Sequence, residues 1–178
     1  MVDKQTAEQL MKIKQGGERE QALKAILSMN TRDALIDYAR RLKRPPYLHL
    51  SDLADVCIDR CIDEGFLHGN YVKLPEPLPQ DTERVDLHRM WLKAIAITNK
   101  CSLPTINSVK NRGYLNAMLK QIDKIEDIGT GGFDRLNNDG VPEYSAEYLM
   151  RKYFSDLLRE DQIEKIDKLL NDNGIRLS

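Results

Sequence analysis

The residues best suited to recognise a nucleic acid gather in the segment 104–112. An asparagine can form two hydrogen bonds with an adenine edge, an arginine can bind a guanine edge or a phosphate, and a lysine binds phosphate. Asparagine and cationic side chains alternate in this segment with two apolar residues, which would face inward. The candidate nucleic-acid contacts in this region are Lys100, Thr105, Asn107, Ser108, Lys110, Asn111 and Arg112.

The residue order over 94–112 favours a helix-turn-helix. Ala96 is small enough to lie where two helices cross, 98–102 can form the turn, and Pro104 suits the first turn of the second helix. Ile106 and Val109 lie three residues apart and would both face the core. The glycine common in such turns is absent, and the alternative is an ordinary corner between two packed helices.

Gly113 is predicted to end the second of these helices. The apolar residues before it, at 106 and 109, do not lie on the same helical face as those after it, at 115, 118, 119 and 122. The pattern therefore predicts a short recognition helix, followed by a supporting helix that begins after the glycine.

A second basic cluster precedes Pro45. It consists of Arg40, Arg41, Lys43 and Arg44, and Tyr47 follows it. These cations could bind a phosphate backbone, but cations at a helix C-terminus also interact favourably with the helix dipole. The two basic clusters support one function only if the fold brings them to one face.

Charge is segregated along a chain whose formal net charge is −1. The 36 residues 87–122 contain six basic side chains and no Asp or Glu. Such a block is typical of a surface that meets an anion, and a phosphate backbone is the first candidate. A pair of buried helices that lacks acidic residues is the alternative explanation.

No metal, cofactor or catalytic site is predicted. Cys57 and Cys61 lie one helical turn apart with histidines within reach, but they fall on an apolar stripe, where buried thiols are the rule. The stretch 135–140 resembles a calcium loop, yet Arg135 and Ala146 stand where its ligands should be. No motif places a base beside a nucleophile. We therefore expect reduced cysteines and a protein that is not an enzyme.

Helical periodicity runs through nearly all of the 178 residues and predicts a mainly α fold. We expect a compact multi-helix domain of seven or eight helices, with at most one short β-hairpin near 66–74. Gly16 and Gly17 are expected to separate two helices, and 128–142 to form an irregular loop. The predicted division is an N-terminal helical region (1–74), a proline-rich linker or boundary (75–80) and a C-terminal helical region (81–178). Both halves can also pack as one domain.

The apolar and aromatic tract 144–170 is expected either to close the core or to form a homo-oligomer interface. No apolar run is long enough to span a membrane, and we expect a cytoplasmic protein.

The leading functional hypothesis is a non-enzymatic DNA- or RNA-binding or regulatory protein that uses 94–112. The alternative is an all-α adaptor or inhibitor, whose acidic segments 45–86 and 123–178 bind a protein partner.

Overall fold

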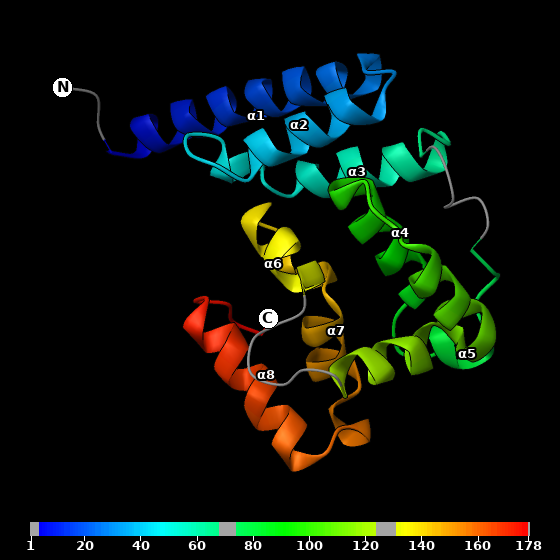
Figure 1. Ribbon diagram of the computed structural model, residues 1–178. Helices are drawn as coiled ribbons and strands as arrows, with labels where there is room; N and C mark the ends of the chain where they lie inside the picture. The colour runs from blue at the N-terminus through cyan, green and yellow to red at the C-terminus, as the bar shows by residue number, and fades with distance from the viewer. Residues whose placement is uncertain (1–3, 68–73, 124–130, 178) are drawn as a thin grey trace. The chain divides into compact units, whose positions relative to one another are not determined.

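The chain folds into two compact units, Met1–Leu67 and His68–Ser178 (Figure 1). The computed structural model describes the backbone of residues 4–67, 74–123 and 131–177, and side chains from Gln15 onward. These residues form eight α-helices and no strand, which confirms the predicted mainly α fold. The predicted hairpin near 66–74 centres on 68–73, which lie outside the described residues.

The first unit is a three-helix assembly. Its core joins Ile26 of the first helix to Leu35 and Ile36 of the second and to Leu53 and Ile58 of the third, all of them almost fully buried. The elements in chain order are α1 (Lys4–Ser28), α2 (Arg32–Leu42), the 3₁₀ helix η1 (Leu48–Leu50) and α3 (Leu53–Asp63).

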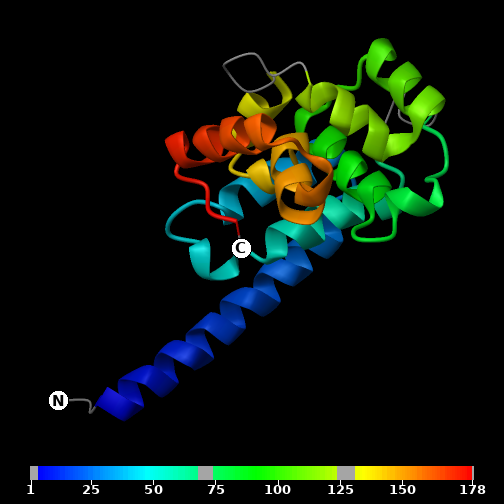
Figure 2. The same cartoon turned by 90° about the horizontal axis from the view of Figure 1, so that it is seen from below.

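The prediction that Gly16 and Gly17 separate two helices is wrong. Figure 2 shows α1 as one uninterrupted helix. Two helical glycines cost about 1 kcal/mol each relative to alanine, and the burial of Ala22 and Ile26 after them stabilises the helix. Arg19 forms two hydrogen bonds with Asp52 at 3.0 and 2.6 Å, and the ring of His49 lies 2.9 Å from Glu18.

The second unit is built around one apolar core. Leu87, Tyr114, Phe133, Leu149 and Phe154 are nearly inaccessible to solvent within it. The elements in chain order are η3 (Pro79–Asp81), α4 (Leu87–Thr98), α5 (Leu103–Ile122), α6 (Gly131–Asn138), η4 (Pro142–Tyr144), α7 (Ala146–Tyr153), η5 (Ser155–Leu157) and α8 (Glu160–Asp172).

The prediction of an irregular loop over 128–142 is wrong for its described part. Residues 131–138 form α6, and η4 begins at Pro142. Phe133 and Leu136 lie three residues apart and are both buried, so packing of one face stabilises a helix that starts with two glycines. Gly140 has a positive φ of 75°, and the turn that follows α6 passes through it.

The proline-rich segment 75–80 packs within the second unit. The Tyr114 hydroxyl donates a hydrogen bond to the carbonyl of Pro75 at 2.9 Å, and Asp81, directly after the segment, is fully buried. The two compact units themselves divide between Leu67 and His68. The prediction that 75–80 also acts as a linker or boundary is not tested by this packing and stays a prediction.

The tract 144–170 closes the core of the second unit. Tyr144, Tyr148, Phe154 and Ile166 are all buried, whereas Leu157 is 45% exposed. The core interpretation is therefore confirmed for these residues, and a homo-oligomer through the same tract stays a prediction. None of the described helices combines the length and the apolar character that crossing a membrane requires.

Candidate nucleic-acid interface

The turn between α4 and α5 is built by two capping residues. Asn99 adopts the left-handed conformation at φ 52° and ψ 30°, and its N–H donates to the carbonyl of Ile95 at 2.8 Å. Ser102 then accepts a hydrogen bond from the N–H of Thr105 at 3.3 Å and so begins α5. Asn99 thus occupies the conformation for which a turn usually employs glycine, because asparagine enters this region more readily than most residues.

The first segment of α5, residues 103–112, has one buried face and one exposed face. Ile106 and Val109 are 2% and 1% exposed, as the sequence predicted, and they anchor the segment to the core. Ala96 of α4 is fully buried, which agrees with its predicted place at the helix crossing. The outward residues Asn107, Lys110, Asn111 and Arg112 are exposed, and Thr105 and Ser108 are half-buried.

Gly113 interrupts α5, which confirms the predicted break. Its φ of 77° and ψ of 171° lie far from helical values. A side chain there would meet Leu78 and Asp81, because a Cβ would lie 2.9 Å from Leu78 Cδ1 and 3.1 Å from Asp81 Oδ2. Only glycine therefore combines this backbone conformation with the close approach of 78–81.

Asp81 supports the point where α5 resumes. Its Oδ1 accepts a hydrogen bond from the N–H of Leu115 at 2.8 Å, and its Oδ2 accepts one from the N–H of Leu78 at 2.9 Å. The break leaves backbone N–H groups at the start of the second helical segment, and a carboxylate from a distant part of the chain satisfies one of them. The break is thus held by tertiary contacts.

An open groove with a volume of about 740 Å³ lies beside this break. Of the predicted nucleic-acid contacts, Lys110, Asn111 and Arg112 line it. Two further residues suited to phosphate or base contacts line it from beyond the break, Asn116 and Lys120, and sequence reasoning missed both. The sequence analysis assigned only a supporting role to the segment after Gly113. The predicted site therefore ended at the break.

The cations of this groove have no carboxylate partner among the described residues. Within the part of the chain that the structure describes, Lys110, Arg112 and Lys120 form no ion pair. The one acidic residue that lines the groove, Asp123, is engaged elsewhere: its Oδ1 accepts from Arg159 at 3.0 Å and from Gln162 at 2.8 Å. The groove therefore presents positive charge to solvent.

The second basic cluster belongs to the first unit. Arg40 is paired with Asp37 at 3.1 Å, and Lys43 forms the C-cap of α2. Arg41 and Arg44 are exposed and form no ion pair with any described residue. A capping role thus accounts for part of this cluster, as the helix-dipole interpretation expected, while two of its cations face solvent.

The cysteines are poorly suited to nucleophilic chemistry. Burial raises the pKa of the Cys57 thiol to about 12, and burial also raises the pKa values of Cys61 and Cys101. No three His, Cys, Asp or Glu side chains gather as metal ligands in the described parts of the chain. His68, one of the histidines near the Cys57 and Cys61 positions in sequence, lies outside those parts.

Comparison of the chain with protein-family models, with curated proteins and with solved structures gives no match.

Proposed function

We propose that this protein binds nucleic acid, and in the first place double-stranded DNA, through the first segment of α5 and the groove beside Gly113. The observation that carries the proposal is the composition of this surface. Its exposed polar side chains are amides, cations that form no ion pair with a described residue, and one carboxylate that Arg159 and Gln162 engage.

The dimensions of the segment suit the major groove of DNA. Ten residues of helix are roughly 15 Å long, and the major groove, about 12 Å wide, admits an α-helix. Asn107 and Asn111 lie one turn apart on the exposed face and would contact base edges. Lys110 and Arg112 flank them and would bind phosphates.

The groove extends the phosphate-binding surface past the helix break. Lys120 lies on the second segment of α5, yet it lines the same groove as Arg112. A backbone that follows the groove would therefore meet cations from both segments. Electrostatic contacts of this kind supply most of the non-specific affinity for nucleic acid.

Fluorescence anisotropy with the full chain tests this proposal. The probes are a labelled mixed-sequence duplex, a labelled single-stranded RNA and, after selection from a random pool, the preferred duplex. We expect the wild type to bind the duplex at low salt more tightly than about 100 µM, the weak end of non-specific binding. Tighter binding to the RNA would move the proposal from DNA to RNA.

The asparagine variants separate base contacts from folding effects. Asn107→Ala or Asn111→Ala should cost roughly 1–3 kcal/mol on the preferred duplex and little on the mixed sequence. Lys168→Ala is the matched control, because Lys168 is exposed on α8 and does not line the groove. If the wild type binds neither DNA nor RNA, the acidic-surface adaptor becomes the leading hypothesis.

A further inference from the structure

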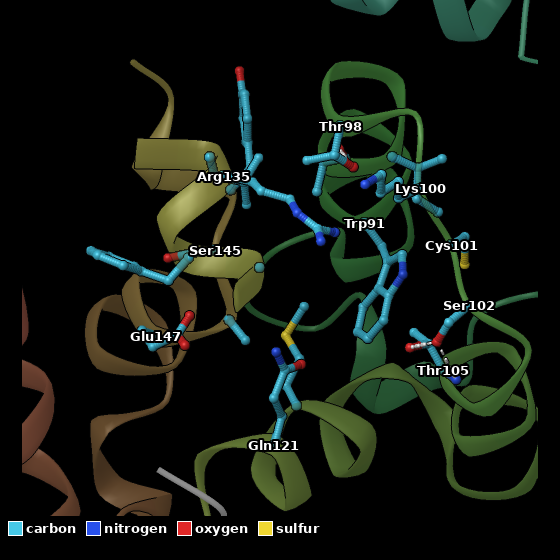
Figure 3. Close-up of a pocket in the computed structure, with 18 of the residues that line it drawn as sticks. Trp91, Thr98, Lys100, Cys101, Ser102, Thr105, Gln121, Arg135, Ser145 and Glu147 are labelled. Atoms are coloured by element: carbon cyan, nitrogen blue, oxygen red, sulfur yellow. Dashed lines mark hydrogen bonds between the residues drawn. The ribbon is translucent and has the colours of Figure 1, made fainter. Parts of the chain in front are cut away.

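A second cavity, with a volume of about 700 Å³, lies on another side of the α4–α5 corner (Figure 3). It is lined by α4, the turn, both segments of α5, α6, η4 and α7. Its volume falls in the range of about 300–1,000 Å³ that is typical of small-molecule sites. Of the candidate nucleic-acid contacts, Lys100 and Thr105 line this cavity, whereas Asn107, Lys110, Asn111 and Arg112 do not.

One wall of the cavity is a fixed aromatic ring. Trp91 packs edge-on against Tyr114, with ring centroids 5.7 Å apart and planes at 69°. A ring packed against a buried neighbour offers a rigid apolar surface, so little conformational freedom is lost when a ligand packs against it. Met118, Phe133 and Leu136 add further apolar lining.

The α7 side of the cavity carries a carboxylate. Glu147 is fully buried, and Figure 3 shows its carboxylate on the cavity side of α7. Glu147 already makes contacts through part of its side chain, and its Oε2 accepts no hydrogen bond from a described residue. A carboxylate oxygen is a hydrogen-bond acceptor, so Oε2 can take a further donor, and an ammonium group is a strong donor to a carboxylate.

Two cations lie at the edge of the same cavity. Lys100 in the turn and Arg135 on α6 are exposed, and neither forms an ion pair with a described residue. Figure 3 shows the Arg135 guanidinium directed into the cavity from α6. The planar guanidinium binds carboxylates through two parallel hydrogen bonds.

We propose that this cavity binds a small aromatic zwitterion of the amino-acid or dipeptide type. The carboxylate of the ligand would pair with Arg135 and Lys100, its ammonium group would donate to Glu147, and its ring would pack along Trp91. The arrangement places both signs of charge at one apolar cavity, which matches a zwitterion better than a molecule with a single charge. This inference does not depend on the proposed binding of nucleic acid.

The fluorescence of Trp91 reports directly on this cavity, because the chain has one tryptophan. We propose titrating the full chain with L-phenylalanine and L-phenylalanyl-L-phenylalanine, and with phenethylamine and 3-phenylpropionate, which each lack one charge. At least one zwitterion should bind more tightly than both singly charged compounds. Calorimetry with the same four compounds registers binding that leaves the fluorescence unchanged.

Two variants assign the two charges. Glu147→Gln should weaken the zwitterion and phenethylamine about tenfold or more and leave 3-phenylpropionate unchanged, because the ammonium group then faces a neutral amide oxygen in place of a charged carboxylate. Arg135→Gln should weaken the zwitterion and 3-phenylpropionate instead. Arg176→Gln, an exposed arginine outside the cavity, is the control.

Three results would overturn the inference. The first is that none of the four compounds binds by either method. The second is that neither zwitterion binds more tightly than both singly charged compounds. The third is that the two variants weaken the binding of all compounds equally. Arg135 is exposed, so Arg135→Gln keeps the test valid even if Glu147→Gln fails to fold. Nucleic-acid binding is measured separately, and its failure would leave this result unaffected.

Discussion

Asp81→Ala tests whether a carboxylate outside α5 holds the interruption of that helix. Asp81 is fully buried and accepts the N–H groups of Leu115 and Leu78 at 2.8 and 2.9 Å. The substitution leaves the buried N–H of Leu115 without its acceptor, at a cost of about 1–3 kcal/mol. Leu78 N–H is only partly buried, and water can replace its partner at a cost of about 1 kcal/mol.

The expected loss in the free energy of unfolding is therefore about 2–4 kcal/mol. Natural domains have about 5–15 kcal/mol in all, so the loss is large enough to measure accurately. Urea denaturation followed by Trp91 fluorescence reports on the second unit, to which the one tryptophan belongs. The midpoint should fall while the slope stays constant, which marks a change in stability alone.

Asp172→Ala provides the matched control for this experiment. Asp172 ends α8, is exposed and forms no ion pair with a described residue, so its loss should change stability by less than about 0.5 kcal/mol. If Asp81→Ala behaved like this control, the carboxylate would not hold the restart of α5, and the reasoning about the break would be refuted.

Two further substitutions test local backbone conformation. Asn99→Ala should destabilise the second unit by about 1 kcal/mol, because alanine bears the full cost of the left-handed conformation. Asn99→Gly should be nearly neutral in the same urea assay. An equal loss of stability for both variants would contradict this account of the turn. Gly16→Ala and Gly17→Ala should each raise the stability of α1 by about 0.5–1 kcal/mol, since a Cβ at either position meets nothing within 4 Å. Circular dichroism during thermal unfolding measures the second pair of variants, and a lower Tm in either would show that these glycines serve a purpose beyond the helix.

Periodicity predicted the break in α5 because the residues on each side of Gly113 need different faces buried. Ile106 and Val109 cannot share one stripe with Leu115 and Met118 in a straight helix, and all four are buried in the structure. A conflict of this kind is visible in the sequence. The role of Asp81 is not, because the hydrogen bond joins residues 34 positions apart.

The failures at α1 and α6 have one cause, which is the weight given to glycine. A local rule treats Gly16 or Gly132 as a point where a helix ends, but packing against distant residues decides the outcome. In α6 the informative signal was the pair Phe133 and Leu136, three residues apart and both buried. In α1 it was Ala22 and Ile26, which lie four residues apart on one buried face after the glycines.

The sequence predicted part of the candidate site and missed its extension. Asn107, Asn111 and Arg112 are exposed as predicted, whereas Ser108 is half-buried, because the anchoring residues Ile106 and Val109 fix the orientation of the short helix. Lys120 joins the same groove only because α5 breaks and resumes, and the direction of the second segment cannot be derived from local pattern. The cavity beside Trp91 is lined by six parts of the chain that only the fold brings together, so no motif indicated it.

The central claim is that Arg112 and its neighbours bind the phosphates of nucleic acid. The most direct test is the dependence of the binding constant on salt concentration, measured by anisotropy for the wild type, Arg112→Ala and the control Lys168→Ala. The account predicts a linear fall of log K with log salt for the wild type, and a slope that is about one unit shallower for Arg112→Ala, because one contact that releases a counterion is lost. Lys168→Ala should retain the wild-type slope. A wild-type affinity that does not change with salt, or equal slopes for wild type and Arg112→Ala, would contradict the claim.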